Sequence, residues 1–310
     1  MRLAARAPGK VNLGLLVGPP RSDGRHELAS LLEPLSLADE VVLAPAGEGE
    51  ERDVVSCEGV EGVNLATRAL EAYRALTGWD GPPVRLAIDK RVPVAAGMGG
   101  GSSDAAAALR LAGHAAGRPL HMLVPAEHAA LAAAAFGLGA DVPALLDPGP
   151  ALVLGAGEDV RPLPALPAHG VLVLPSRERL STAEVFARAD RSGAAREPAA
   201  FAELATRLAR ACESGAMPPA ELLRNDLQAP AIELCPAIGP ALEEAREAGA
   251  DHALLSGSGP TVFGLFLGAD GERRARDAAR VLAGREPAPI ACAPVSPEWA
   301  RPRTEGAEDR

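Results

Sequence analysis

The sequence reads Pro93-Val94-Ala95-Ala96-Gly97-Met98-Gly99-Gly100-Gly101-Ser102-Ser103-Asp104 between two regular segments. Four of the five residues from 97 to 101 are glycine, so the backbone can approach a ligand closely and adopt positive φ angles. Before this loop the segment 84–88 predicts a strand, and after it the alanine-rich run 105–117 predicts a helix. Free amides and the dipole at a helix start attract phosphate. The loop therefore predicts a phosphate-binding site. Lys90, which lies just before the loop, also favours this prediction.

This loop matches neither of two common nucleotide-binding patterns. It is not a Walker A loop, because no Gly-Lys-Ser/Thr follows, and the pattern G-x-G-x-x-G lacks its third glycine. The alternative interpretation is a flexible turn in which a serine or aspartate caps the helix. The strand before the loop, the helix after it and Lys90 favour phosphate binding.

Three further segments carry candidate site residues. Lys10, in the run Pro8–Leu13, borders an apolar strand, and partial burial would make it a point charge for phosphate or a perturber of a neighbour's pKa. Asp141, in the run Gly137–Pro143, could act as a general base toward a hydroxyl group. The small-residue loop Leu255–Thr261 could approach a substrate or a second phosphate. Taken alone, each has an ordinary alternative: a solvated lysine, an Asp-x-Pro turn and a hairpin.

The overall composition narrows the class of protein. The chain has 310 residues, 47% of them apolar, so it can bury the core of one large domain or of two lobes. A formal charge of −10 without a run of Lys and Arg argues against a nucleic-acid partner. Four scattered cysteines indicate neither disulfides nor a zinc site, and no stretch reaches the ~18 apolar residues that span a bilayer. We therefore expect a cytoplasmic protein with reduced thiols, no membrane partner and no metal held by its own side chains.

Helices and strands alternate along the whole chain. Asn64 caps a helix over 65–76, and further helices are expected at 126–136, 181–190, 200–213, 219–234, 237–249 and 271–284. The Gly- and Pro-rich stretch 147–168 is the best candidate for a lobe boundary. The last stretch, 293–310, holds proline and charge without periodicity. We predict an α+β fold with an N-terminal lobe over 1–160, a C-terminal lobe over 161–292 and a disordered tail over 293–310.

Taken together, the loops resemble three ordered motifs of the GHMP kinase superfamily, which includes galactokinase, homoserine kinase and mevalonate kinase. Pro8–Leu13 is similar to the first motif, Pro93–Ser103 to the second, which is the ATP-phosphate loop, and Leu255–Phe263 to the third. Within the superfamily the chain most resembles the kinases of 4-diphosphocytidyl-2-C-methyl-D-erythritol, over about residues 5–285. The segments that carry this resemblance are 10–13, 21–26, 38–41, 64–66, 97–105, 139–143, 181–186 and 225–227.

The resemblance implies a two-lobed fold with a mixed-sheet N-terminal lobe and a ferredoxin-like C-terminal lobe. It implies transfer of the ATP γ-phosphoryl group to the 2-hydroxyl of the cytidine diphosphate-linked methylerythritol, with Asp141 as the base and Lys10 as its charged partner. Mg²⁺ is expected on the phosphates. We expect a monomer or a weak homodimer. The implied ATP contacts are Pro93, Val94, Ala95, Ala96, Gly97, Met98, Gly99, Gly100, Gly101, Ser102 and Ser103, and the implied substrate contacts are Asn12, Arg25, His26, Phe186, Gly257 and Ser258.

One position departs from the family pattern. The family usually has Asp-Gly-Tyr-His, with the tyrosine stacked on cytosine, and this chain has Arg25 in place of that tyrosine. Arginine can also lie flat on a base, and Phe186 is the other candidate for stacking.

Two alternative functions are a GHMP kinase for another small alcohol, of the homoserine or mevalonate type, and a nucleotide-binding regulator without catalysis. The segments 23–26 and 182–186 argue against another alcohol. The presence of both Lys10 and Asp141 argues against the regulator, because a protein that only binds has no need of the pair.

Overall fold

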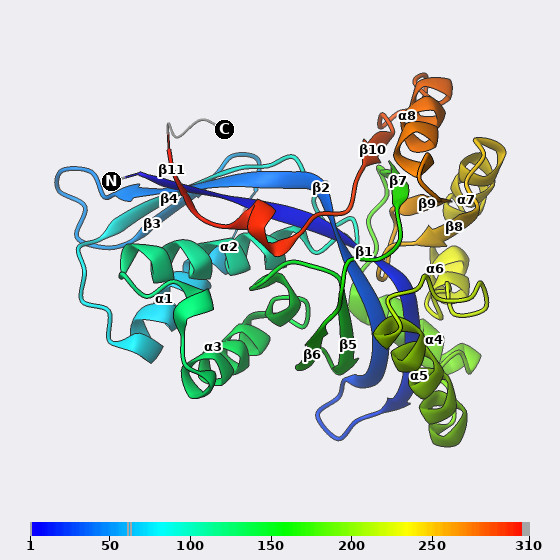
Figure 1. The fold of residues 1–310 in the computed structure, drawn as a ribbon, viewed down its shortest axis with the longest axis horizontal. Coiled ribbons are helices and arrows are strands. Elements are labelled where there is room, and N and C mark those ends of the chain that lie inside the picture. The colour runs from blue at the N-terminus through cyan, green and yellow to red at the C-terminus, as the bar shows by residue number, and fades with distance from the viewer. Residues whose placement is uncertain (1, 61, 63, 306–310) are drawn as a thin grey trace.

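The computed structural model describes residues 2–60, 62 and 64–305. Two long paired strands, β1 (Leu3–Pro20) and β2 (His26–Pro45), run through the middle of the molecule. Figure 1 shows the first three helices gathered near the starting half of β1 and the later helices near its far end. The predicted α+β fold is confirmed.

The N-terminal sheet is built around this strand pair. Its path is β11-β1-β2-β4-β3, and β5 pairs with the first part of β2, with β6 beside β5. All its pairs are antiparallel except β3 with β4. The remaining strands are β3 (Val54–Cys57), β4 (Val84–Asp89), β5 (Ala151–Gly155), β6 (Asp159–Pro162) and β11 (Arg303–Thr304).

One face of this sheet is covered by α1 (Leu65–Thr77), α2 (Gly100–Ala115) and α3 (Pro125–Leu138), as Figure 1 shows. Every second residue of β4 is buried, which is the pattern of a strand with one face on a core. Helix α2 is buried over most of its length, because its run of four alanines lets the sheet and the neighbouring helix α1 approach closely. Short 3-10 turns at Leu120–Met122 and Pro143–Leu145 flank α3.

The C-terminal half forms a second, antiparallel sheet in the order β10-β7-β9-β8. This order, with α7 and α8 packed on the strands, is the ferredoxin-like arrangement that the resemblance implies. Its strands are β7 (His169–Leu174), β8 (His252–Leu255), β9 (Val262–Leu267) and β10 (Ile290–Cys292). Its helices are α4 (Thr182–Ser192), α5 (Pro198–Glu213), α6 (Gln228–Leu234), α7 (Ile238–Glu247) and α8 (Gly271–Val281).

The two sheets share a hydrophobic core. Val11 and Leu13 of β1 are buried in one cluster with Val171 of β7 and Phe263 of β9. Position 160, where we divide the lobes, lies inside β6. The division of the lobes at residue 160 stays a prediction.

The prediction of a disordered tail is wrong for residues 293–305. Within β2, the Ser36 amide donates to the Ala293 carbonyl and the Pro34 carbonyl accepts from the Val295 amide, a 3-10 turn follows at Pro297–Ala300, and β11 pairs with the start of β1. The outer edge of β1 offers unpaired backbone groups, which this segment satisfies without any periodic pattern of its own. Residues 306–310 lie outside the described part of the chain.

The predicted helix over 219–234 is only partly confirmed. Regular helix is present from Gln228 to Leu234, and residues 219–227 form turns. The reason is a tertiary contact, because the backbone around Asn225 pairs with Leu15 of β1 instead of with itself. No helix of the described residues is long and apolar enough to cross a membrane.

Candidate active site

Lys10 lies on β1 at the meeting point of the three predicted loops. Its side chain is only 4% exposed, and its ammonium group donates hydrogen bonds to Asn12 Oδ1 at 2.8 Å and to the carbonyl of Gly97 at 3.2 Å. Its backbone amide also donates to the carbonyl of Met98 at 2.9 Å. The structure thus brings the first two motifs into direct contact.

Asp141 provides the negative charge nearest to Lys10. Its Oδ2 lies 3.5 Å from the Lys10 Nζ atom, and its side chain is 36% exposed. Helix α3 ends at Leu138 and the next turn begins at Pro143, so the loop between them carries Asp141 to the open side of the lysine. A partly exposed ion pair adds only about 0–1 kcal/mol to stability. This geometry therefore suits a carboxylate that must reach a ligand.

The glycines of the second motif are required by close contacts. At Gly97 the φ angle is 76°, and a Cβ there would lie 2.3 Å from the carbonyl oxygen of Ser256. At Gly99 the φ angle is 66°, and a Cβ would lie 3.1 Å from the Lys10 side chain. A larger residue at either position would therefore displace the third loop or the lysine.

A cavity of about 360 Å³, the loop cavity, lies over this glycine loop. Residues 93–102 line it, together with Cys57, Val60, Asn64, Leu65, Lys90 and Asp104. Helix α2 begins at Gly100, earlier than the alanine run predicts, so the last glycines and the serines form its first turn. Ser103 does not line this cavity: its hydroxyl group is buried without a hydrogen-bond partner among the described residues.

Lys90 is not the free phosphate ligand that its position in the sequence favours. Its ammonium group binds two carboxylates, Asp39 and Asp104, which are 0% and 3% exposed. Asp39 also accepts hydrogen bonds from the backbone amides of Arg91 and Val92. Burial opposes the charge on Lys90, but the two carboxylates outweigh it and raise the pKa of this lysine. Lys90 therefore anchors the start of the glycine loop from below.

This arrangement raises the pKa of Asp104. Burial, together with the nearby charge of Asp39, raises the pKa of Asp104 to about 7, although Lys90 acts in the opposite direction. Sequence reasoning missed this cluster, because Asp39 precedes Lys90 by 51 positions and only the fold brings the two together.

The predicted substrate residues line two cavities that meet. The central cavity, of about 260 Å³, is lined by Lys10, Asn12 and Asp141, and it shares Gly97 and Gly99 with the loop cavity. The outer cavity, of about 490 Å³, shares other residues with the central one: Leu28, Ala140, Ala156, Thr182 and Phe186. The three cavities therefore form a row with Lys10 and Asp141 in the middle.

Asn12 has a role in orienting its neighbours. Its Oδ1 accepts from Lys10, and its Nδ2 donates to Ser30 Oγ at 2.7 Å. Ser30 in turn donates to the carbonyl of Gly14. The amide of Asn12 is thereby fixed with its oxygen toward the lysine.

The outer cavity is lined by the predicted base-binding residues. The rings of His26 and Phe186 lie 5.1 Å apart between centroids, and His26 Nε2 is 2.8 Å from Asp190 Oδ1. Arg25 lines the same cavity, and its guanidinium carbon lies 4.3 Å from the ring centroid of Phe136. Sequence reasoning missed Phe136 and Asp190, since both lie on helices far from position 25 and have no local signal.

The third loop connects β8 to β9 and closes the site from the other lobe. Ser256 Oγ lies 3.0 Å from the carbonyl oxygen of Gly97, to which it donates, and Ser258 Oγ lies 2.9 Å from Thr182 Oγ1. Gly257, whose φ angle is 56°, and Ser258 both line the central cavity. All three motifs therefore surround one cleft.

Two family models and several known proteins are similar to this chain. Models of the GHMP kinase N-terminal and C-terminal domains match residues 64–149 and 194–285. A 4-diphosphocytidyl-2-C-methyl-D-erythritol kinase from Anaeromyxobacter dehalogenans is 43% identical over 294 residues, which cover 92% of this chain and 86% of that protein. The kinase of the same name from Leifsonia xyli is 41% identical over 310 residues, which cover 92% and 95% of the two chains.

Two solved structures of similar proteins superpose on this chain. The crystal structure of a 4-(cytidine 5'-diphospho)-2C-methyl-D-erythritol kinase superposes with a TM-score of 0.72 at 36% identity, covering 94% of this chain and 99% of the other. A homoserine kinase from Cytophaga hutchinsonii superposes with a TM-score of 0.66 at 17% identity, covering 98% and 96% of the two chains, which shows a common fold alone.

Proposed function

This chain belongs to the GHMP kinases and, within them, to the 4-diphosphocytidyl-2-C-methyl-D-erythritol kinase family, and on that premise we propose how its cleft works. It transfers the γ-phosphoryl group of ATP to the 2-hydroxyl group of 4-diphosphocytidyl-2-C-methyl-D-erythritol, a step toward isoprenoid precursors. The observation that carries this proposal is the Lys10–Asp141 pair, which lies in the cavity between the glycine loop and the cavity of Arg25 and Phe186.

Asp141 is the general base. The 2-hydroxyl oxygen attacks the γ-phosphorus, the bond from that phosphorus to the β,γ-bridging oxygen breaks, and ADP leaves. The hydroxyl proton passes to the Asp141 carboxylate. A tertiary alcohol is a hindered nucleophile, so a positioned base is useful, and such a base contributes typically 10²–10⁴-fold.

Lys10 is the charged partner of this base. Its hydrogen bonds to Asn12 and to the Gly97 carbonyl fix the ammonium group between the carboxylate and the glycine loop. From there it orients Asp141 and stabilises negative charge on the reacting oxygens. Phosphoryl transfer depends mostly on positioning and charge neutralisation, which a fixed cation supplies.

The loop cavity holds the ATP phosphates. The first intrahelical hydrogen bond of α2 runs from the Ser103 amide to the Gly99 carbonyl, so the amides of Gly100, Gly101 and Ser102 can donate to phosphate oxygens, and Ser102 adds a hydroxyl group at the cavity wall. The side chain of Met98 is buried in the core, so its contribution comes from its backbone. Ser103, for the same reason, would support the loop from inside.

The residues around the loop cavity fit a Mg²⁺ ion that is carried by ATP. No group of three or more His, Cys, Asp or Glu side chains within the described residues gathers into a metal cage, and Mg²⁺ usually binds through phosphates, water and one or two protein oxygens. Asp39 and Asp104 are bound to Lys90, which leaves the Ser102 hydroxyl group to hold the ion beside the phosphates. When bound, Mg²⁺ neutralises charge on the transferred group.

The outer cavity receives the cytosine end of the substrate. Phe186 and Arg25 line it, and a guanidinium group can lie flat on a base as a ring does. Phe136 supports Arg25 from its other side at 4.3 Å. In this chain a cation stacked on a phenyl ring therefore takes the place of the family tyrosine.

The test is ADP release with the cytidine diphosphate-linked methylerythritol, homoserine and mevalonate in parallel. We expect turnover with the first alcohol alone. Turnover only with homoserine or mevalonate would contradict the substrate assignment, and no turnover with any of them would favour a regulator that only binds nucleotide. The monomeric or weakly dimeric state and the cytoplasmic location stay predictions.

A further inference from the structure

Asn225 and Asp226 lie in the turn between α5 and α6, which crosses the middle of β1. The backbone amide of Leu15 donates to the carbonyl of Arg224 at 2.7 Å, and the amide of Asp226 donates to the carbonyl of Leu15 at 2.9 Å. Both side chains are buried, at 7% and 8% exposure. Two buried polar side chains in a turn need partners, and their partners identify what they do.

The side-chain amide group of Asn225 binds the third loop. Its Nδ2 donates to the carbonyl of Leu255 at 2.8 Å and to the carbonyl of Gly257 at 2.7 Å. Its Oδ1 accepts from the backbone amide of Leu227 at 2.9 Å, which fixes the side chain in this orientation. Both amide hydrogens therefore hold the segment that ends at Gly257.

Gly257 connects the segment that Asn225 binds to the groups around Lys10. A Cβ on Gly257 would lie 2.8 Å from the carbonyl oxygen of Gly97 and 3.2 Å from the Lys10 ammonium. The neighbouring Ser256 also donates to the Gly97 carbonyl, which itself accepts from Lys10. A shift of the third loop would therefore change the surroundings of both the lysine and the glycine loop.

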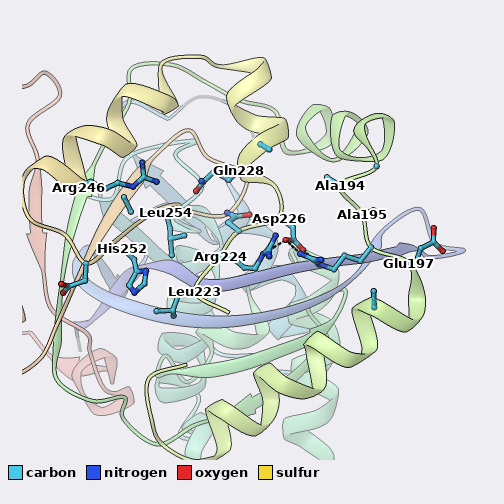
Figure 2. Close-up of a pocket in the computed structure, with 17 residues that line it drawn as sticks. Ala194, Ala195, Glu197, Leu223, Arg224, Asp226, Gln228, Arg246, His252 and Leu254 are labelled. Carbon is cyan, nitrogen blue, oxygen red and sulfur yellow. Dashed lines mark hydrogen bonds and ion pairs between the residues drawn. The ribbon is translucent and has the colours of Figure 1, made fainter. Parts of the chain in front are cut away.

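Asp226 fixes the turn from the opposite side. Its carboxylate accepts two hydrogen bonds from Arg196, at 2.7 Å each, one from Arg224 at 3.0 Å and one from the backbone amide of Val17 at 3.1 Å. Figure 2 shows Arg224 and Asp226 side by side in a cavity of about 920 Å³, the rear cavity. Asn225 lines this rear cavity and not the central one, so it acts on the site from behind.

We propose that Asn225 is a positioning residue for phosphoryl transfer, which sets the third loop and, through Gly257, the Lys10 ammonium, while Asp226 locks its turn to β1. The readout by turnover rests on the proposed function. A hydrogen-exchange readout does not, so failure of one is distinguishable from failure of the other.

The experiment compares Asn225→Ala with Gln228→Ala. Gln228 is the matched control, because among the described residues its one side-chain hydrogen bond to the same loop accepts from the backbone amide of Leu255. We expect Asn225→Ala to lower kcat by at least thirtyfold, with the KM values for ATP and for the alcohol within threefold of the parent. Gln228→Ala should keep kcat within threefold. A loss of kcat below threefold in Asn225→Ala, or equal losses in both variants, would overturn the proposal.

A second measurement needs no substrate. Hydrogen exchange followed by mass spectrometry should show faster exchange at residues 97–99 and 255–261 in Asn225→Ala, with β4 unchanged. Unchanged exchange in both loops would refute the link. If Asn225→Ala does not fold, Asn225→Asp replaces it: the carboxylate keeps the acceptor for Leu227 and loses both donors to the loop, so the same kcat loss and the same exchange pattern are expected.

Discussion

Lys10 and Lys90 both contact the glycine loop, and their surroundings differ in the number and the exposure of the carboxylates beside them. Within the described part of the chain, Lys10 faces one carboxylate, Asp141, that is 36% exposed, and its other side-chain partners are neutral oxygens. Lys90 faces two carboxylates, Asp39 and Asp104, that are 0% and 3% exposed. Both ammonium groups are largely buried. The two lysines are therefore distinguished by how exposed their carboxylate partners are.

This difference teaches how the same pair of residue types serves two purposes. A carboxylate open to a cleft can exchange its lysine for a substrate hydroxyl during a reaction. The Lys90 carboxylates are almost fully buried and already bound to their lysine, and removal of that cation leaves two buried carboxyl groups without a cationic partner. The Lys10 pair thus suits chemistry, and the Lys90 cluster holds the backbone on which that chemistry depends.

The largest effect is expected at the open carboxylate. Asp141→Asn removes the proton acceptor and keeps the shape, so kcat should fall by about 10²–10⁴-fold. ATP affinity, measured by titration calorimetry, should stay within threefold, because the loop cavity is unchanged. A kcat within fivefold of the parent would remove Asp141 from the role of base and would break the contrast.

The sealed cluster should show its effect in stability instead. Lys90→Met leaves Asp39 and Asp104 buried without a cation, which costs about 3–5 kcal/mol in the free energy of unfolding. Lys10→Met should cost about 1 kcal/mol, since Asp141 is open to water, while turnover falls sharply. Urea unfolding at pH 7 measures both. Equal losses of stability in the two variants would contradict the distinction.

Glu33 extends this comparison, because among the described residues it is a buried carboxyl group with no cation bound to it. It is 0% exposed, both its oxygens lack a hydrogen-bond partner among the described residues, and burial raises its pKa from 4.5 to about 8. The folded protein then binds this proton more tightly than the unfolded chain does. Its contribution to stability is complete below about pH 4.5 and is lost as the pH rises through about 8.

The slope of this loss is up to about 1.4 kcal/mol per pH unit. Glu33→Gln carries no titrating group, so its unfolding free energy should lack that slope between pH 5 and 8. Urea unfolding across this range, with the parent beside it, is the measurement. Parallel pH profiles of the two proteins would show that Glu33 is ionised in the folded state.

The smallest effect is expected for the cation that is stacked on a ring. Phe136→Leu removes the support behind Arg25, and an exposed cation–π contact contributes about 0.5–1 kcal/mol. KM for the cytidine-linked alcohol should therefore rise by about two- to fivefold, with KM for ATP unchanged as the internal control. No change in the first KM would mean that Arg25 needs no support from Phe136.

Local patterns predict those parts of the molecule that are set by local forces. The helix capped by Asn64 begins at Leu65 and ends at Thr77, close to the predicted 65–76, because cap and periodicity lie within its own residues. The motifs at Lys10, Asp141 and Gly257 meet in one cleft. The family resemblance, over most of the chain, supplied their roles.

The features that sequence reasoning missed depend on partners far along the chain. The counterions of Lys90 come from β2 and α2, the ring behind Arg25 comes from the last turn of α3, and Asn225 binds a loop thirty residues later. The segment 293–305 is ordered by backbone contacts to β2 and β1 at the opposite end of the sequence. No local pattern records such contacts.

The continuous ladder of β1 and β2 has a consequence for how the protein melts. Leu3 of β1 lies in the core beneath the first three helices, Val11 in the core shared by the two sheets, and Val17 among the C-terminal helices. One strand therefore threads every major core, and no lobe can unfold without exposing apolar surface in its neighbour. We therefore expect the two lobes to unfold as a single cooperative unit, and a fragment that begins at residue 161 would lack the strand on which its own helices pack.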